Sequence, residues 1–136
     1  MTTYKLILLI IHNFSFQTSE APQTMSPEQI VQKQLDTYNA RDIEGFMSVM
    51  DEDVALYNFS DGELLAKGKA NVKSSYTNLF KNSPRLKSVL TNRIVLGHQV
   101  IDHESITGRM GNPEVLELVV IYELRAEKIY KITVIT

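Results

Sequence analysis

The sequence predicts an α+β domain in which helices pack on one face of an antiparallel sheet. Two observations carry this prediction. Apolar residues recur at helical spacing in the first part of the chain, and from Leu86 onward they follow the pattern of strands joined by short turns. The 136 residues, 43% hydrophobic and 22% charged, show no repeat, internal linker or low-complexity segment. We therefore expect one folded domain, from residue 25 to residue 136.

The first 24 residues have the order of a secretory signal peptide. Lys5 precedes an apolar run from Leu6 to Ile11, and small residues follow, up to Ala21. The run is too short to span a bilayer. His12 and Asn13 interrupt the apolar region, so a disordered or strand-adding leader is the alternative. We expect an exported protein, periplasmic or secreted, and a cytoplasmic one if the alternative holds.

Three helices are expected, and each begins at a recognisable signal. Ser26 as N-cap, Pro27 at the first helical position and Gln29 at the third form a capping box, which starts a helix that runs to about Ala40. Asp42 caps a second, shorter helix, on whose buried side we expect Ile43, Phe46, Met47 and Met50. A third helix follows Gly68, with Val72, Tyr76, Leu79 and Phe80 at helical spacing.

Five strands are expected. The first runs from Val54 to Phe59 and ends at the turn residues Ser60, Asp61 and Gly62. The other four follow the third helix, at about residues 87–96, 99–107, 115–125 and 128–135. Gly97, the loop GRMGNP and the turn RAEK separate them. Such a meander forms an antiparallel sheet.

Charge and cysteine content exclude several classes of function. The formal charge is -2 and the 14 Lys and Arg residues are scattered, so we expect no nucleic-acid partner. The chain has no cysteine, which rules out disulfides, thiolate nucleophiles and cysteine-ligated metal clusters.

Three segments resemble the nuclear transport factor 2 (NTF2)-like superfamily, and in particular its SnoaL-like and steroid delta-isomerase-like bacterial members. They are YNARDIEGFMSVMDEDVALYNF, GKANVKSSY and LELVVIYELRAEKIYKITVI, and the resemblance covers residues 27 to 135. It implies a cone-shaped fold, in which three N-terminal helices pack on a curved antiparallel sheet around a small-molecule cavity. These motifs specify a fold better than they specify a chemistry.

The resemblance does not extend to the usual ketosteroid isomerase chemistry. It places Gln34 where those enzymes carry an oxyanion-hole tyrosine, and Asn58 where they carry the general-base aspartate. Their protonated aspartate falls on Val120, and only a supporting tyrosine is matched, by Tyr76. Asparagine takes up no proton at neutral pH, and valine donates no hydrogen bond.

The segment VIDHESITG, from Val100 to Gly108, places a histidine between two carboxylates. Successive strand residues point to opposite faces, so Asp102 and Glu104 share one face, His103 takes the other, and the three cannot converge on one ion. We expect the carboxylates to face outward, solvated or paired with Lys or Arg of neighbouring strands. A two-ligand metal site is the alternative, but a divalent ion needs more oxygen ligands. We expect no metal and no cofactor.

The resemblance, with the loop GRMGNP kept at the family's length, places His103 on the cavity face together with Ile101, Ser105 and Thr107. The residues expected to line the ligand pocket are Gln34, Tyr38, Met50, Leu56, Asn58, Tyr76, His103, Ser105, Leu118, Val120 and Tyr122. This composition suits a small, mainly apolar ligand with one or two polar handles.

Three functions stay open at this level. The first is ligand binding in the cone. The second is a small-molecule isomerase, cyclase or hydrolase with His103 as catalytic acid or base, since histidine titrates near neutrality; a histidine that only orients a ligand or satisfies the core is the alternative for this residue. The third is a protein-interaction module that uses the convex sheet face. That face is expected to carry Val119, Ile121, Ile129 and Ile135, which favours a homodimer.

Overall fold

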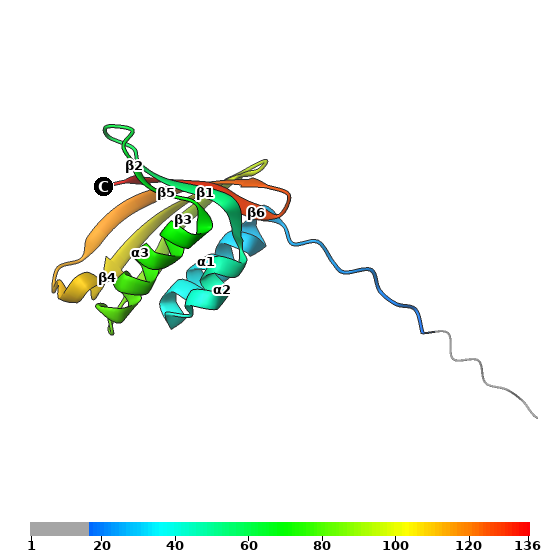
Figure 1. Ribbon diagram of the computed structural model, residues 1–136, viewed down its shortest axis with the longest axis horizontal. Coiled ribbons are helices and arrows are strands. Elements are labelled where there is room, and N and C mark those ends of the chain that lie inside the picture. The colour runs from blue at the N-terminus through cyan, green and yellow to red at the C-terminus, as the bar shows by residue number, and fades with distance from the viewer. Residues whose placement is uncertain (1–16) are drawn as a thin grey trace, which may run out of the picture.

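The computed structural model describes residues 17–136 (Figure 1). Along the chain its elements are α1 (Pro27–Ala40), α2 (Ile43–Ser48), β1 (Met50–Asn58), β2 (Leu64–Lys67), α3 (Lys69–Lys81), β3 (Lys87–Leu96), β4 (Gln99–Thr107), the 3-10 turn η1 (Arg109–Gly111), β5 (Leu116–Arg125) and β6 (Lys128–Ile135). The predicted leader falls mainly outside the described residues, and export stays a prediction. Within residues 17–136, no helix has the length and apolar character needed to cross a membrane.

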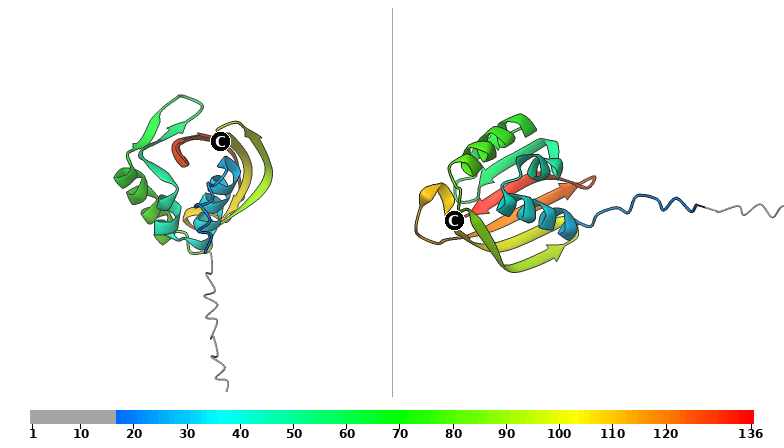
Figure 2. Two further views of the ribbon diagram at one scale, coloured as in Figure 1. Left: turned by 90° about the vertical axis from the view of Figure 1, so that its right-hand side faces the viewer. Right: turned by 90° about the horizontal axis from the view of Figure 1, so that it is seen from below.

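The six strands form one sheet in the order β2-β1-β6-β5-β4-β3. Neighbouring strands are antiparallel except β1 and β6, which run parallel. The sheet curves round the helices, which lie against its concave side (Figures 1 and 2). The predicted α+β architecture of three helices on a curved sheet is therefore confirmed. The short strand β2 and the parallel pair were not predicted.

The local start signals account for the helix boundaries. The Gln29 backbone N–H donates to the Ser26 hydroxyl at 3.2 Å, and the Ser26 N–H donates to the Gln29 side chain at 2.8 Å, which completes the predicted capping box. Asp42 accepts from the Gly45 N–H at 3.0 Å and caps α2. The placement of Met50 on α2 was wrong, because α2 ends at Ser48 and Met50 begins β1, where it is buried in the core.

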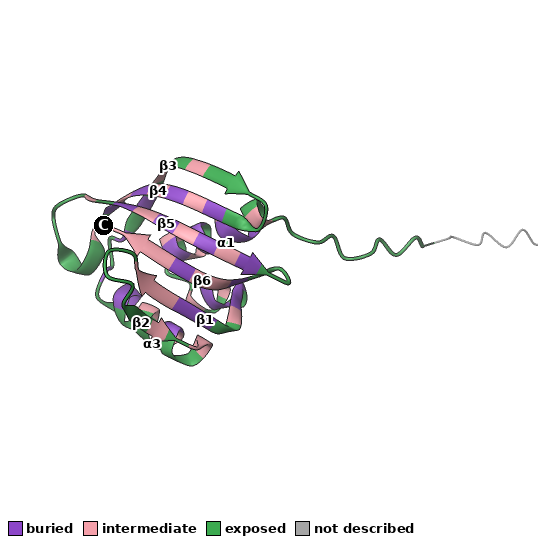
Figure 3. Cartoon of the chain, turned by 90° about the horizontal axis from the view of Figure 1, so that it is seen from above, coloured by how far each residue is buried: buried purple, intermediate pink, exposed green. Residues whose placement is uncertain are grey.

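The pairing of β4 with β5 decides which side chains face the helices. Asp102 pairs with Val120 and Glu104 with Leu118. Paired residues of antiparallel strands share a face, so both carboxylates point toward the helices, and they are 0% and 4% exposed. Figure 3 shows the resulting alternation of buried and half-buried residues along these strands. The expectation that the two carboxylates face outward was wrong.

His103 pairs with Val119 and lies on the convex face. Ile101, Ser105 and Thr107 share that face, so their predicted inward orientation was also wrong. The prediction depended on the loop between β4 and β5, where a shift of one residue exchanges the two faces of a strand. This loop takes an unusual course, with positive φ at Gly108, Met110 and Gly111. A second irregularity, a bulge between Glu123 and Leu124, turns Ile129 from the expected convex face into the core.

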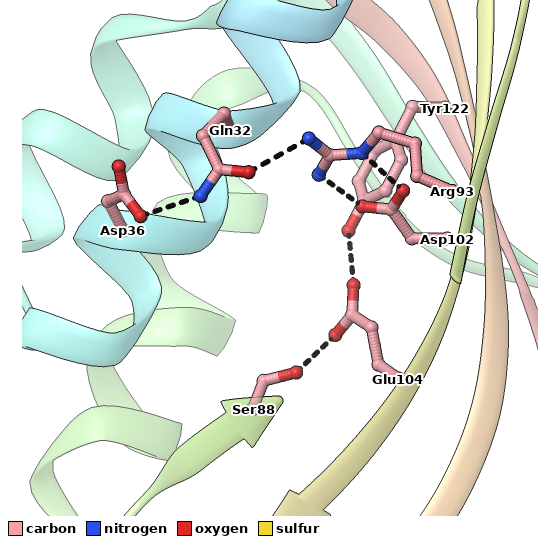
Figure 4. Close-up of polar contacts among 7 residues, drawn as sticks. All are labelled: Gln32, Asp36, Ser88, Arg93, Asp102, Glu104 and Tyr122. Atoms are coloured by element: carbon pink, nitrogen blue, oxygen red, sulfur yellow. Dashed lines mark hydrogen bonds and ion pairs between the residues drawn. The ribbon is translucent and has the colours of Figure 1, made fainter. Parts of the chain in front are cut away.

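A buried ion pair joins the edge of the sheet to α1 (Figure 4). Arg93 on β3 donates from Nε and Nη2 to the two carboxylate oxygens of Asp102, each at 2.7 Å, and from Nη1 to the Gln32 side chain of α1 at 2.8 Å. The Arg93 side chain is 8% exposed and that of Asp102 is fully buried. The prediction that a carboxylate of this segment pairs with Arg or Lys of a neighbouring strand is thus confirmed for Asp102, although the pair lies inside the fold.

Replacing Asp102 with Asn should lower the free energy of unfolding by about 3–5 kcal/mol, because it leaves a buried guanidinium beside a neutral amide. Urea denaturation followed by circular dichroism measures this change. Asp53→Asn is the matched control, since Asp53 is exposed and lies 3.6 Å from Arg125; its loss should cost less than about 1 kcal/mol. Equal effects of the two substitutions would contradict a buried role for Asp102.

Candidate functional site

A cavity of about 330 Å³ lies between the concave face of the sheet and the helices α1 and α3. Its volume falls in the usual range of small-molecule sites. The residues that line it are Gln34, Leu35, Tyr38, Leu56, Asn58, Leu65, Tyr76, Glu104, Ile106, Arg109, Leu116, Leu118, Val120, Tyr122, Ile132, Val134 and Thr136. The exposed members of this set, Leu65, Arg109 and Thr136, mark its opening.

Most residues expected at the pocket do lie in this lining. The structure brings together Gln34, Tyr38, Leu56, Asn58, Tyr76, Leu118, Val120 and Tyr122. Three expected residues are elsewhere: Met50 is 1% exposed and packs in the hydrophobic core, and His103 and Ser105 are on the convex face. The sequence pattern placed α1, β1, α3 and β5 correctly relative to the cavity, and it failed on β4.

His103 takes part in a polar cluster outside the cone. Its Nε2 lies 2.7 Å from a carboxylate oxygen of Glu117, and the hydroxyl of Ser105 donates to the other oxygen of Glu117. The His103 and Glu117 side chains are 43% and 55% exposed. His103 therefore cannot exchange a proton with a molecule held inside the cavity.

Glu104 is the carboxylate that the cavity presents, and sequence reasoning missed it. The Ser88 hydroxyl donates to one of its oxygens at 2.6 Å, and the Tyr122 hydroxyl lies 3.4 Å from the other (Figure 4). Burial raises the pKa of Glu104 above its usual value and the charge of Asp102 adds to this, whereas the hydrogen bonds from Ser88 and Tyr122 and, more weakly, the charge of Arg93 oppose it. The pairing with Leu118 would have identified Glu104, had the β4–β5 loop been aligned one residue differently.

Two buried polar atoms of α1 have no hydrogen-bond partner within residues 17–136. They are the side-chain oxygen of Gln34 and the hydroxyl of Tyr38, and both residues line the cavity and are 5% exposed. Buried polar groups are nearly always hydrogen-bonded, and an unpaired one costs about 1–3 kcal/mol. These two atoms are consequently available to a polar group of a ligand.

The three tyrosines of the lining remain neutral at physiological pH. Burial raises the pKa of Tyr76 to about 12, and burial raises the pKa values of Tyr38 and Tyr122 above their ordinary range. Each phenol can therefore donate as well as accept a hydrogen bond. Residues 17–136 hold no group of three or more His, Asp or Glu side chains placed to bind a metal ion.

The opening of the cavity is shaped by the loop after β4. Gly108 has a φ of 71°, and a Cβ at this position would collide with the carbonyl group of Arg85. The Met110 N–H donates to the buried hydroxyl of Ser83 at 2.8 Å. This close approach and this hydrogen bond hold the loop against the segment between α3 and β3, and Arg109 of η1 lies at the rim of the cavity.

Glu104→Gln should become increasingly stabilising, relative to the wild type, as the pH rises. The pKa of Glu104 is higher in the folded than in the unfolded chain, so the folded state binds this proton more tightly. Wild-type stability is therefore lost as the pH rises from the ordinary Glu pKa through the raised one. The Tm of the variant minus that of the wild type should increase as the pH rises above the ordinary Glu pKa of about 4.

Calorimetric scans over this pH series provide the measurement, with Glu117→Gln as control. Hydrogen bonds from Ser105 and His103 hold the pKa of the exposed Glu117 below its usual range, so its Gln variant should gain nothing as the pH rises. A pH-independent difference for Glu104→Gln would show that this carboxyl titrates normally.

Comparison with known proteins agrees with this geometry. The family model of the SnoaL-like domain matches residues 31–132. A search of curated protein sequences gave no significant match. Among solved structures, an uncharacterised cystatin-fold protein of Novosphingobium aromaticivorans superimposes with a TM-score of 0.76 at 23% identity, covering 82% of this chain and 99% of its own.

Two further structures share the fold at lower identity. An NTF2-like protein of unknown function from Cytophaga hutchinsonii has a TM-score of 0.70 at 12% identity, over 84% of this chain and 92% of its own. A protein with a ketosteroid isomerase-like fold from Catenulispora acidiphila, in complex with trimethylamine, has a TM-score of 0.65 at 14% identity, over 81% and 85%. The family match extends over most of the folded domain, and the chain belongs to the SnoaL-like domain family, with the NTF2-like fold.

Proposed function

We propose that this protein binds a small, mainly apolar molecule with a polar handle in the cavity of the cone. The observation that carries the proposal is a cavity of about 330 Å³ whose lining combines apolar side chains with polar ones, two of which, Gln34 and Tyr38, hold a buried polar atom without a hydrogen-bond partner. A ligand group that hydrogen-bonds both atoms would remove the free-energy cost of leaving them unpaired in the ligand-free protein. The bound trimethylamine in the Catenulispora acidiphila protein supports small-molecule binding by this fold.

An enzyme that works through His103 is not supported, because His103 and the cavity are on opposite faces of the sheet. The ionisable groups of the described cavity lining are Glu104, Arg109 and three tyrosines. Binding requires the cavity and its polar atoms alone, and it is therefore the function that the geometry favours.

Filling the cavity should abolish binding. Val134 is a half-buried lining residue, and Val134→Trp places an indole in the space that a ligand would occupy. Uncharged apolar compounds that shift the amide resonances of lining residues in wild-type protein should bind the variant at least roughly tenfold more weakly. Leu96→Trp, at an exposed position of β3 outside the lining, is the control and should bind as the wild type does. Unchanged affinities in Val134→Trp would place the ligand elsewhere.

We propose as well that the convex face of the sheet pairs two copies of the chain. Cross-strand neighbours on this face form an apolar row, in which Ile101 contacts Ile94 on one side and Ile121 on the other, with Val119 and Ile135 paired beside it. Ile94 is 54% exposed in the single chain. An apolar patch of this kind on one side of a two-sided sheet is typical of an interface.

Ile121→Arg should convert the dimer to a monomer, because it places a charge at the centre of the apolar row and a desolvated, unpaired charge is strongly unfavourable. Analytical ultracentrifugation gives the mass directly. Leu65→Arg is the control, since Leu65 is an exposed apolar residue that belongs to the short strand β2 at the far edge of the sheet. A wild-type protein that sediments as a monomer at high concentration would overturn this proposal and leave cavity binding unaffected.

A further inference from the structure

Glu104 has no salt-bridge partner in the described structure, and the charge of Arg93 acts on it only as the smallest of the causes that set its pKa. Glu104 is 4% exposed, and within residues 17–136 it takes part in no salt bridge. Arg93, the cation on the neighbouring strand, directs its Nε and Nη2 to Asp102 and its Nη1 to Gln32. Asp102 therefore uses the available positive charge.

The hydrogen bonds of Glu104 come from neutral donors. Ser88 and Tyr122 each contribute one hydroxyl, at 2.6 and 3.4 Å, to different oxygens of the carboxylate. A carboxylate has about four acceptor positions, so acceptor capacity remains on the side of the cavity. An ionised carboxylate that is buried without a positive partner is strongly unfavourable, and it is relieved either by a proton or by an incoming cation.

The groups around Glu104 also favour a positively charged donor. The unpartnered oxygen of Gln34 accepts hydrogen bonds and lines the same cavity. Tyr38, Tyr76 and Tyr122 line it too, and both the phenol oxygens and the faces of aromatic rings attract an ammonium group. The only cationic side chain of the described lining is Arg109, which is exposed at the rim and whose charge lowers the pKa values of Tyr38 and Tyr76.

We propose that the cavity binds an organic cation, an amine protonated at neutral pH and carried on an apolar body, with Glu104 as its counter-ion. This rests on the proposed binding function and specifies its ligand class. The ammonium group lies inward and donates hydrogen bonds to Glu104 and to the Gln34 oxygen. It thereby gives the buried Glu104 carboxylate a salt-bridge partner. The apolar body fills the space between Leu118, Val134 and the opening. A carboxylate ligand would meet Glu104 with like charge and is rejected at this position.

Three probes with the same phenylbutyl body separate these possibilities: 4-phenylbutylamine, 4-phenylbutan-1-ol and 4-phenylbutanoate. Isothermal titration calorimetry at neutral pH measures each affinity for wild type, Glu104→Gln and Glu117→Gln. The amine should bind the wild type at least roughly tenfold more tightly than the alcohol, as expected for a charge-assisted hydrogen bond in a buried site. Glu104→Gln should remove this preference and keep the affinity for the alcohol, whereas Glu117→Gln should behave as the wild type.

The probes also distinguish the two levels of the proposal. If the alcohol binds and the amine binds no better, the cation inference is wrong and cavity binding stands. Tightest binding of 4-phenylbutanoate would overturn the inference in favour of an anion site at Arg109. An amine preference that persists in Glu104→Gln would place the cation away from this carboxylate and overturn it as well. If none of the three binds, the inference fails together with the cavity's capacity for a ligand of this size.

Discussion

The buried pair of Arg93 and Asp102 is the constraint on which much of this molecule depends. Its three hydrogen bonds tie the edge strand β3 to β4 and to Gln32 of α1, and so hold one side of the cone closed. The exchange of hydrogen bonds between the Asn39 side chain and the backbone of Ser88, at 2.7 and 2.9 Å, reinforces the same contact. The pair also affects the electrostatics of the cavity. Arg93 forms its salt bridge with Asp102, and Glu104, two residues further along β4, has no salt-bridge partner within residues 17–136.

Local chemistry explains how much of the fold could be predicted from the sequence. The capping box at Ser26, the Asp42 cap and the helical spacing after Gly68 are short-range signals, and they located where the three helices begin. Which side chains of β4 face the helices depends instead on the register between β4 and β5, and this register is set by the loop from Gly108 to Val115. Both faces of β4 mix apolar and polar residues, Val100, Asp102, Glu104 and Ile106 against Ile101, His103, Ser105 and Thr107. The strand pattern could therefore not correct an error of one residue in that loop.

The cavity of this protein has its carboxylate at a different position from the one that the resemblance to ketosteroid isomerases implies. Gln34, Asn58 and Val120 line the cavity at the positions where the resemblance expected ionisable groups. With neutral side chains at all three, the carboxylate of the site is supplied by β4 instead, through Glu104. A site depends on the particular residues and not on the fold that carries them. Family membership therefore predicted the hollow cone better than it predicted what the cone contains.

The segment VIDHESITG is best understood through its two faces. Asp102 and Glu104 point inward, where one is neutralised by Arg93 and the other is not. His103 and Ser105 point outward and both contact Glu117, beside the apolar row of Ile101 and Ile121. A period of two thus separates four polar residues into an inward pair, of which Glu104 lines the cavity, and a surface pair. Because β4 shares register with both β3 and β5, a change that shifted this strand by one residue would bury the histidine cluster and expose the ion pair. The same register of β4 therefore places the ion pair inside the cone and the histidine cluster on the convex face.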